Sequence, residues 1–441
     1  MEEPTMKIAV IGGGSSYTPE LIEGIILRAT QIKADEIVLV DIEAGKEKLE
    51  IVGSLAKRMI KKSGLPITIE LTFDRVKAIT NADFVLTQFR VGGLDARASD
   101  ERIPLKYDVI GQETVGPGGF AKALRTIPVI LDICKEIEQY SNDAWLINFT
   151  NPAGIVTEAI HKYTSVKAIG LCNVPINMKQ MTATILEVDR DNLNMSFAGL
   201  NHLVYATKVF VNGEDKMSTL IERIAEGRNM NMRNIHDAPW DKEFLQALNA
   251  LPCPYHRYYY MMDEMLIEEK EAAELRGTRA EQVKIIEKGL FETYKNPNLD
   301  VKPKELEERG GSLYSEAAIS LISSIVTNDH AIHTVNVPNN GTITDLPDNV
   351  VIEVSCTVNS EGPQPIQVGK LPPELNGLIQ QIKAFEQLTI EAAVTGNKQK
   401  ALLALTTNPF VPSSKVAKLL LDEILEVNQA YLPQFSMKAL V

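Results

Sequence analysis

The sequence has few cysteines and no long uncharged apolar run. Four cysteines occur among 441 residues, Cys134, Cys172, Cys253 and Cys356, and none forms a C-x-x-C pair. This excludes a disulfide framework and gives no signal for structural zinc or a redox dithiol, so we expect a reducing cytoplasm. No charge-free run approaches the roughly 18 residues that span a bilayer. The N-terminal MEEPTMKIAVIGG places acids before its short apolar segment, so neither export nor membrane insertion is expected.

An excess of basic charge is also absent. The chain has 45 Lys and Arg against 58 Asp and Glu, which gives a formal net charge of −13. Basic clusters such as KRMIKK (Lys57 to Lys62) are interrupted by apolar residues at helical spacing. This pattern predicts a solvated helix face, and nucleic acid is not an expected partner.

Apolar residues, in contrast, are plentiful. They make up 44% of the chain, and single cores stop growing at roughly 250 to 300 residues. We therefore expect two domains, with a nucleotide-binding domain over residues 1–172 and a second domain over residues 173–441.

The segment KIAVIGGGSSYTPEL predicts a buried strand, a glycine-rich turn and a helix that begins near Thr18. The turn has the first two glycines of a dinucleotide fingerprint, Gly12 and Gly14, but a tyrosine at the third position. A second buried strand, EIVLV, leads to Asp41, at the expected distance for a carboxylate that bonds the ribose of NAD. Gly12, Gly14, Ser15 and Asp41 are the candidate coenzyme residues. The alternative is an ordinary strand-to-helix turn.

Further strands are predicted at the rhythm of a parallel, doubly wound Rossmann-like α/β sheet. They cover residues 67–72, 82–89, 144–150 and 166–172, and helical patterns such as LRTIPVILDICKEIEQY separate them. Ligands bind beyond the carboxyl ends of such strands, which places Asn151 and Cys172 at that edge. After about residue 175, strand patterns such as HLVYATKVFVNGED and VVIEVSCTV alternate with long helical patterns, which predicts a C-terminal α+β domain.

A cysteine and a histidine end two apolar segments, in GLCNVPIN and GLNHL. The thiolate of Cys172 and the imidazole of His202 suit a divalent transition metal, and two protein ligands would leave positions open for water or substrate. The alternative is a buried apolar cysteine and a core histidine.

Six ordered motifs give a resemblance over nearly the whole chain. IGGGSSYTPEL, FRVGGLDARASDE, GQETVGPGGF, NFTNPAG, GLCNVPIN and GLNH are similar to those of the NAD- and manganese-dependent family 4 glycoside hydrolases. This resemblance implies a fold like that of lactate and malate dehydrogenases. It also implies that Cys172 and His202 are the metal ligands.

The resemblance also implies a mechanism that departs from the usual pair of carboxylates. NAD⁺ oxidises sugar carbon 3, which acidifies the proton on carbon 2 and permits elimination of the aglycone from carbon 1. Water then adds and the hydride returns, so the net reaction is hydrolysis. The metal serves as a Lewis acid.

Residue roles follow from the same resemblance. Tyr255, in PYHRYYY, matches the base for carbon 2, and Arg257 or the metal would favour its anion. Arg97 and Arg279 match phosphate-site arginines, with a surface salt bridge as the alternative. Ordinary packing is the alternative for the three tyrosines at 258–260.

Three polar residues complete the predicted pocket. Asn151 matches a residue that bonds sugar hydroxyls, Glu113 belongs to the same pocket, and Asn148 contacts the cofactor. Both asparagines could instead cap the turn that the Asn-Pro pair begins.

Asn173 follows the metal cysteine, and the resemblance places asparagine there in 6-phospho-β-glucosidases and aspartate in 6-phospho-α-glucosidases. We therefore predict hydrolysis of a phosphorylated disaccharide or aryl β-glucoside with NAD and Mn²⁺. An asparagine cannot act as a carboxylic acid, so the acid for the leaving group stays unassigned. A 6-phospho-α-glucosidase or α-galactosidase, a malate-type NAD-dependent dehydrogenase and a non-catalytic NAD-binding regulator are the alternatives. A homodimer or homotetramer is implied.

Overall fold

A computed structural model describes residues 6–228, 232, 234–310 and 313–436. Six parallel strands form one half of its sheet, in the spatial order β6-β5-β4-β1-β2-β3. This is the order of a doubly wound dinucleotide-binding sheet. The strands confirm the six predicted ones, some of which are shorter than predicted: β1 (Met6–Ile11), β2 (Ala34–Val40), β3 (Thr68–Thr72), β4 (Phe84–Thr87), β5 (Trp145–Asn148) and β6 (Lys167–Gly170).

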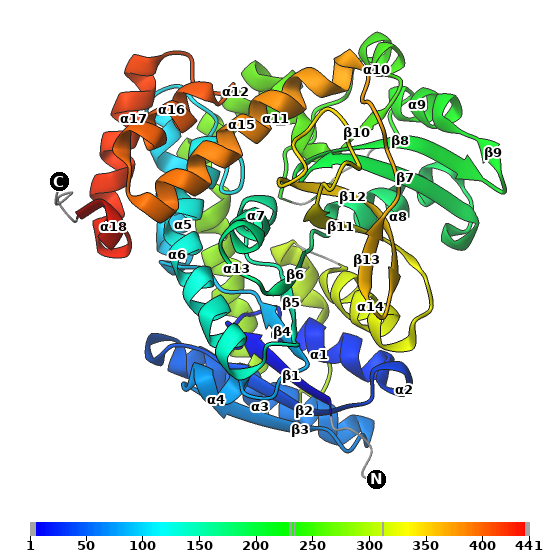
Figure 1. Ribbon diagram of the computed structural model, residues 1–441, viewed down its shortest axis with the longest axis vertical. Coiled ribbons are helices and arrows are strands. Elements are labelled where there is room, and N and C mark those ends of the chain that lie inside the picture. The colour runs from blue at the N-terminus through cyan, green and yellow to red at the C-terminus, as the bar shows by residue number, and fades with distance from the viewer. Residues whose placement is uncertain (1–5, 229–231, 233, 311–312, 437–441) are drawn as a thin grey trace.

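Helices connect these strands and cover both faces of the parallel half (Figure 1). The first of them begins at Thr18, as predicted, and a proline at position 19 opens it. The exposed Lys57, Lys61 and Lys62 lie on one helix whose opposite face is buried, so the predicted solvated face is confirmed. The elements are α1 (Thr18–Leu27), α2 (Ala29–Ile32), η1 (Glu43–Gly45), α3 (Lys46–Ser63), α4 (Arg75–Ile79), α5 (Gly93–Leu105), α6 (Gly116–Tyr140), α7 (Ala153–Tyr163) and α8 (Val174–Leu186).

The C-terminal half continues the same sheet with antiparallel strands, in the order β10-β8-β7-β12-β11. The two halves meet at a single residue pair, Asn336 opposite Gly170. The predicted Asn-Gly turn joins β8 to β9, with both residues at positive φ. Strands β7, β10, β11 and β13 were not predicted. The bounds are β7 (Leu193–Leu200), β8 (Leu203–Val211), β9 (Glu214–Asp215), β10 (Leu251–Pro252), β11 (Ile332–Pro338), β12 (Val351–Asn359) and β13 (Gly362–Pro365).

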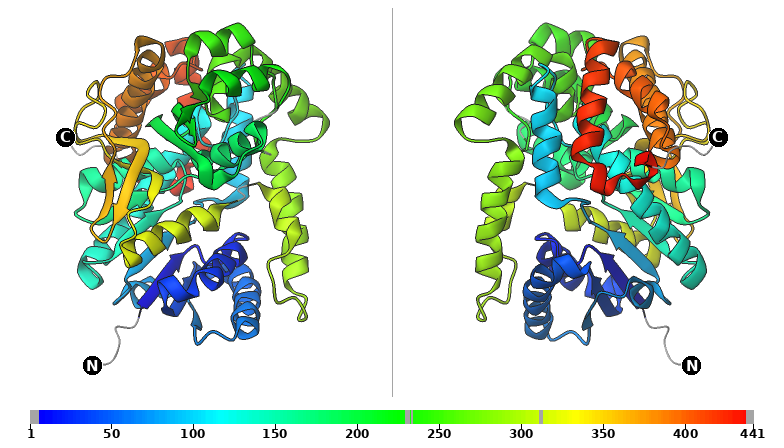
Figure 2. Two further views of the ribbon diagram at one scale, coloured as in Figure 1. Left: turned by 90° about the vertical axis from the view of Figure 1, so that its right-hand side faces the viewer. Right: turned by 90° about the vertical axis from the view of Figure 1, so that its left-hand side faces the viewer.

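The C-terminal helices pack back onto the N-terminal half. Helices α15 and α17 lie against α6 and α5, and α13 runs along the outside of the molecule, where it packs on α5 and α3 (Figure 2). The bounds are η2 (Arg190–Asn192), α9 (Met217–Ala225), α10 (Lys242–Leu248), η3 (Pro254–His256), α11 (Arg257–Tyr260), α12 (Met262–Leu275), α13 (Arg279–Tyr294), η4 (Lys304–Arg309), α14 (Tyr314–Thr327), α15 (Pro373–Thr395), α16 (Lys398–Thr407), α17 (Ser414–Val427), η5 (Gln429–Tyr431) and α18 (Pro433–Ser436).

The hydrophobic core crosses the predicted domain boundary at residue 172. One buried cluster contains Ile8 and Leu39 of the parallel half together with Leu290, Ile319 and Ile352 of the C-terminal half. The division into domains at residues 1–172 and 173–441 therefore stays a prediction. The sheet and the hydrophobic core are continuous across this boundary.

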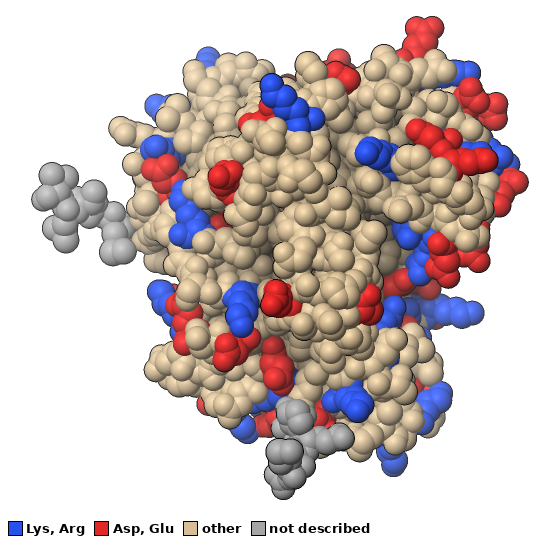
Figure 3. All heavy atoms as spheres, turned by 45° about the vertical axis from the view of Figure 1, so that its right-hand side comes forward, with Lys and Arg blue, Asp and Glu red and all other residues tan. Residues whose placement is uncertain are grey.

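On the face drawn in Figure 3, Lys and Arg lie interspersed with Asp and Glu. Among the described residues, no helix combines the length and the apolar character that a bilayer crossing requires.

Candidate active site

Close contacts with neighbouring residues leave no room for side chains at Gly12 and Gly14, in the turn between β1 and α1. Gly12 has φ +84°, and a Cβ there would lie 2.9 Å from the Phe89 nitrogen. The Gly14 nitrogen donates to Asp41 Oδ2 at 2.9 Å, and a Cβ at Gly14 would lie 2.8 Å from that oxygen. Ile42 also donates its backbone nitrogen to Asp41 Oδ1. The loop therefore fixes the Asp41 carboxylate at the carboxyl end of β2, the position expected for the ribose partner.

Tyr17, at the third fingerprint position, connects this loop to the C-terminal half. Its backbone nitrogen donates to the Ser15 hydroxyl at 3.3 Å, and its own hydroxyl donates to the Gly310 carbonyl. The guanidinium of Arg309 lies over the Tyr17 ring, 4.2 Å from the centroid. A glycine could make none of these side-chain contacts.

Three arginines lie close together beside Tyr17. Arg97 pairs with Glu101 at 2.8 Å, and Arg309 pairs with Glu287 at 3.0 Å. Arg279 has no carboxylate within ion-pair distance in the described ranges. It donates instead to Asn234 Oδ1 at 3.0 Å and to two backbone carbonyls. Burial lowers the pKa of Arg279, and the neighbouring charge of Arg97 lowers it further. Such an incompletely compensated group of guanidiniums suits an anion with several oxygens.

Glu113 lies among three cations at the wall of the same region. Its carboxylate accepts hydrogen bonds from Arg90 and from Lys122 at 3.0 Å, and it forms an ion pair with Arg97 at 3.1 Å. Burial alone would raise the pKa of Glu113, but these charges outweigh it and hold that pKa well below its usual range. Burial, followed by the charge of Arg90, lowers the pKa of Lys122 to about 7.

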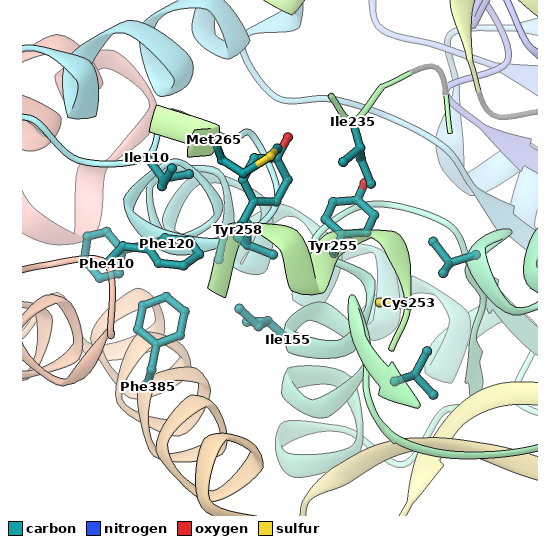
Figure 4. Close-up of a cluster of buried hydrophobic side chains, with 14 of the residues drawn as sticks. Ile110, Phe120, Ile155, Ile235, Cys253, Tyr255, Tyr258, Met265, Phe385 and Phe410 are labelled. Carbon is teal, nitrogen blue, oxygen red and sulfur yellow. The ribbon is translucent and has the colours of Figure 1, made fainter. Parts of the chain in front are cut away.

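Cys172, His202 and Tyr255 come together from three separate elements. Cys172 follows β6, and His202 occupies the turn between β7 and β8 with φ +61°, a left-handed conformation that is rare outside glycine and marks a special backbone position. The ring of Tyr255, from η3, stacks on the His202 ring with centroids 3.9 Å apart and planes 5° apart. The close-up in Figure 4 shows Tyr255 and Tyr258 projecting from one short helical segment.

The chemistry of these donors fits a divalent transition metal. His202 Nδ1 is buried without a hydrogen-bond partner among the described residues. Burial, followed by the charge of Lys122, lowers the pKa of His202 to about 3, so its imidazole is neutral, as a ligand must be. Within the described ranges, no three His, Cys, Asp or Glu side chains group together in a way that could hold a metal ion. A Cys172–His202 site would thus keep open positions, as catalytic metals do.

The surroundings of Cys172 and Tyr255 disfavour charge on both side chains. Burial raises the pKa of the Cys172 thiol well above its usual range, and Glu353 adds to that rise. Burial also raises the pKa of the Tyr255 phenol, with a further contribution from Cys172, while a hydrogen bond with Thr114 acts in the opposite direction. A bound cation would reverse the electrostatic part of both shifts.

Arg257 is engaged away from the Tyr255 phenol. Its guanidinium donates to Ala238 O at 2.8 Å and pairs with Asp237 at 2.9 Å. It also lies over the Trp240 ring, 5.4 Å from the centroid. The choice between Arg257 and the metal as the cation that favours the Tyr255 anion stays a prediction.

The tyrosines that follow Tyr255 pack in the core, as their alternative interpretation predicted. Tyr258 is buried beside Met265 (Figure 4), and Tyr259 contacts the Phe410 ring with centroids 4.7 Å apart. The Tyr260 hydroxyl lies 2.6 Å from that of Tyr205.

Three asparagines at the strand ends have structural partners. Asn148 is fully buried, and its Oδ1 accepts from Thr87 Oγ1 at 2.9 Å and from the Thr150 nitrogen at 3.0 Å. Asn151 Oδ1 accepts from the Ala153 nitrogen at 3.3 Å, which is the turn-capping alternative. Asn173 is the N-cap residue of α8. Contacts of these side chains with cofactor or sugar stay predictions.

Several residues of this region were not predicted. Lys122 and Arg309 lie in segments whose sequence gives no ligand pattern. Two other residues did leave a signal in the sequence. Asn201 directly precedes His202. Glu353 lies inside the apolar run VVIEVSC, and a carboxylate within a buried strand is unusual and calls for an explanation.

A glycine-rich loop, a cysteine, a histidine and a tyrosine in one region, and a group of arginines beside Tyr17 are thus in place, and the comparisons with known proteins show the family of the chain. Residues 7–188 match the model described as Family 4 glycosyl hydrolase, and residues 197–411 match its C-terminal domain. The chain belongs to family 4 of the glycosyl hydrolases, as the sequence motifs indicated.

Particular relatives are similar over almost their whole length. A probable 6-phospho-β-glucosidase of Bacillus subtilis is 57% identical over 435 residues, which is 98% of each chain. The 6-phospho-β-glucosidase of Thermotoga maritima, solved with manganese, NAD⁺ and glucose 6-phosphate, superposes with a TM-score of 0.88 at 40% identity, covering 97% of this chain and 99% of that one. The maltose-6′-phosphate glucosidase MalH of Clostridium acetobutylicum is 32% identical over 449 residues, 98% of this chain and 99% of that one.

The predicted likeness to malate dehydrogenase is confirmed as a likeness of fold. The enzyme from Plasmodium falciparum superposes with a TM-score of 0.56 at 16% identity, over 88% of this chain and 99% of that one.

Proposed function

We propose that this chain is a 6-phospho-β-glucosidase that uses NAD and a divalent metal, with Mn²⁺ as the first choice. Its substrate is a 6-phosphorylated β-glucoside such as cellobiose 6-phosphate or an aryl β-glucoside, and one product is glucose 6-phosphate. The observation that carries the proposal is the Cys172–His202–Tyr255 cluster, which lies in a chain 57% identical to a probable 6-phospho-β-glucosidase. The 32% identity to MalH makes the phospho-α-glucosidase activity the second candidate.

Bound NAD would accept and return a hydride at sugar carbon 3, and the metal would act as a Lewis acid. Gly12, Gly14 and Ser15 form the coenzyme loop, where helix α1 offers backbone N–H groups to the pyrophosphate. Asp41 accepts hydrogen bonds from the ribose hydroxyls and favours NAD over its 2′-phosphorylated relative. Asn148 supports the cofactor from the end of β5.

The remaining residues hold the sugar and move its proton. Cys172 and His202 hold the metal, and Tyr255 removes the proton from carbon 2 through its phenolic oxygen. Asn151 and Glu113 bond sugar hydroxyls, and Asn173 lies beside the leaving group, where it cannot supply a carboxylic proton. The anionic form of Glu113 makes it a hydrogen-bond acceptor rather than an acid.

The phosphate group is held by Arg97 and Arg279. Arg279 suits this role because its described partners are an amide and two carbonyls, so its positive charge is available to an anion. The charges of Glu101 and Glu113 offset that of Arg97 in the free enzyme.

The test is release of p-nitrophenol from the 6-phosphorylated β- and α-glucosides under reducing conditions, with NAD⁺ and Mn²⁺ each omitted in turn. We expect turnover of the β-substrate, loss of turnover without either component and no net NADH. Turnover of the α-substrate alone would make 6-phospho-α-glucosidase the assigned activity in place of 6-phospho-β-glucosidase. Cleavage that ignores NAD⁺ and metal would refute the mechanism, and stoichiometric NADH production would indicate a dehydrogenase.

The proposal also covers the cellular compartment and the oligomeric state of the enzyme. We place it in the cytoplasm, since a half-buried metal-binding thiol requires reducing conditions. A homodimer or homotetramer is proposed on the strength of the family resemblance, and light scattering would measure it.

A further inference from the structure

A row of buried polar residues crosses the sheet behind the predicted metal ligands. Where the parallel and antiparallel halves meet, Gly170 lies opposite Asn336, Asn336 opposite Glu353, and Glu353 opposite Gly199. Cys172 comes two residues after the first member of this row, and His202 three residues after the last. Asn336 and Glu353 are both fully buried.

Glu353 joins this row to the metal ligands through Asn201. Glu353 Oε1 accepts from Asn336 Nδ2 at 2.8 Å and from Asn201 Nδ2 at 3.2 Å. The Asn201 side chain also lies beside the Cys172 thiol, and its Oδ1 accepts from the Gly154 nitrogen at 3.3 Å. Asn201 directly precedes His202. Asn201 thus lies beside Cys172 and is the chain neighbour of His202. Its side-chain amide is held by the hydrogen bond to Glu353.

The packing around this network leaves it little freedom. A Cβ at Gly154 would lie 2.8 Å from Asn201 Cβ, and one at Gly170 would lie 2.8 Å from Asn336 Cβ. Both asparagines are therefore seated against glycines, so a shift in either one would move the strand ends that it contacts.

Glu353 differs from the other buried carboxylates of the neighbourhood because it has no ion-pair partner in the described chain. Glu158 and Glu386 both pair with Lys383, at 2.6 and 2.5 Å. Glu353 Oε2 has no hydrogen-bond partner among the described residues, and although the same holds for Glu386 Oε2, that oxygen lies 2.5 Å from Lys383 Nζ. A buried carboxyl group without a cation destabilises a fold, so such a group in a native site calls for another explanation.

We propose that Glu353 is a positioning residue for the metal site. Through Asn201 it fixes Cys172 and His202 at the separation that binds the divalent cation, in the way that outer residues orient ligands in other metal sites. This inference rests on the proposed metal site and goes beyond it, because Glu353 itself touches neither the metal nor the substrate.

The test is a Mn²⁺ titration of the full chain with NAD⁺ present. The concentration of free Mn²⁺ is measured by electron paramagnetic resonance. Glu353→Leu removes the acceptor, and we expect Mn²⁺ affinity to fall about 10–100-fold, the usual effect of such outer residues. Glu353→Gln keeps an oxygen acceptor and should retain affinity within about 3-fold of the wild type. NAD⁺ affinity, measured by fluorescence, should be unchanged in both variants.

A second variant covers the case in which Glu353→Leu does not fold. Asn201→Ala leaves Glu353 in place and cuts the connection, so it should weaken Mn²⁺ binding to the same degree. Glu386→Gln is the matched control, since it also alters a buried carboxylate near this sheet but should leave Mn²⁺ affinity unchanged. Thermal melting of each variant separates lost stability from lost affinity.

The outcomes distinguish the positioning role from the metal site itself. Wild-type Mn²⁺ affinity in both Glu353→Leu and Asn201→Ala would overturn the positioning role, provided that His202→Ala abolishes binding. Mn²⁺ binding that survives His202→Ala would overturn the proposed metal site, and the positioning role with it. An equal loss of affinity in Glu353→Gln and Glu353→Leu would also overturn it, because the retained acceptor would then have no effect.

Discussion

The proposed coenzyme end and the proposed metal end of the site are built in different ways. The coenzyme end consists of one continuous turn, Gly12 to Tyr17, and the residue that ends the next strand, Asp41. The metal end draws Cys172, His202, Tyr255 and Glu353 from strands and turns up to 181 residues apart in the sequence. The first is set by local backbone geometry, and the second by the register of a sheet that joins the two halves of the chain.

Because of this difference, we expect that a substitution can weaken binding at one end of the site without weakening it at the other. A change in the coenzyme loop should alter NAD affinity without moving the metal ligands, and a change in the sheet register should do the reverse. The following predictions sharpen that separation.

The largest effect is expected from Tyr255→Phe. The variant keeps the ring that stacks on His202 but loses the phenolic base, so kcat should fall about 10²–10⁴-fold. Mn²⁺ and NAD⁺ affinities should stay within about 2-fold, since neither ligand set changes. Tyr258→Phe, on the same helical segment, is the control and should keep its activity. Activity of Tyr255→Phe within about 10-fold of the wild type would remove the tyrosine from its proposed role.

A smaller effect is expected from Arg279→Ala. Loss of a charged hydrogen-bond donor to phosphate, about 1.5–3 kcal/mol, should raise KM for the phosphorylated substrate about 10–100-fold with little change in kcat. Arg276→Ala is the matched control, because Arg276 is exposed and pairs with Glu268. Initial rates at varied substrate concentration measure both constants. A loss confined to kcat would contradict the phosphate role.

Asp41→Asn tests the coenzyme end. The amide keeps the shape of the carboxylate beside the Gly14 nitrogen but lacks its charge. NAD⁺ affinity should fall about 10-fold, in line with the loss of one charged hydrogen bond, and the preference over NADP⁺ should narrow. Isothermal titration gives both affinities. If Mn²⁺ affinity fell in parallel, the two ends would not be independent.

The smallest effect concerns stability in acid. Burial lowers the pKa of His256 to about 3 and that of His333 to about 4, so both are neutral in the fold at neutral pH. In the unfolded chain they bind protons below about 6.5, so stability should be lost as pH falls from 6.5 towards 3–4. His333→Gln should make this decline shallower, as measured by urea unfolding between pH 7 and 4.5. An unchanged slope would contradict the linkage.

The parallel half could be predicted from the sequence because its signals are local. Most of its six strands are short apolar runs, and their spacing with helical segments leaves few possible topologies. The coenzyme loop followed from two glycines and Asp41. The reason for Gly14 did not follow, because the close neighbour of Gly14 is the Asp41 carboxylate, which only the folded chain brings there.

The metal end could be predicted only by resemblance. No spacing rule joins Cys172 to His202 or Tyr255, since their proximity depends on strand pairings that the sequence does not encode locally. Strand β11 was missed because Asn336 interrupts its apolar pattern. The contacts of Arg257 with Asp237 and Trp240 could not be read from the sequence either. The buried Glu353 was visible in the sequence as a charge inside a strand, but its partners were not.

The single pair that joins the two halves of the sheet, Asn336 and Gly170, bears on how such enzymes can be recombined. An exchange of residues 173–441 with those of a relative would replace one side of this seam and much of the shared core. A working chimera would therefore need a graft that matches Gly170 in size and strand direction, so substrate range in this scaffold is better altered by changing side chains than by exchanging halves.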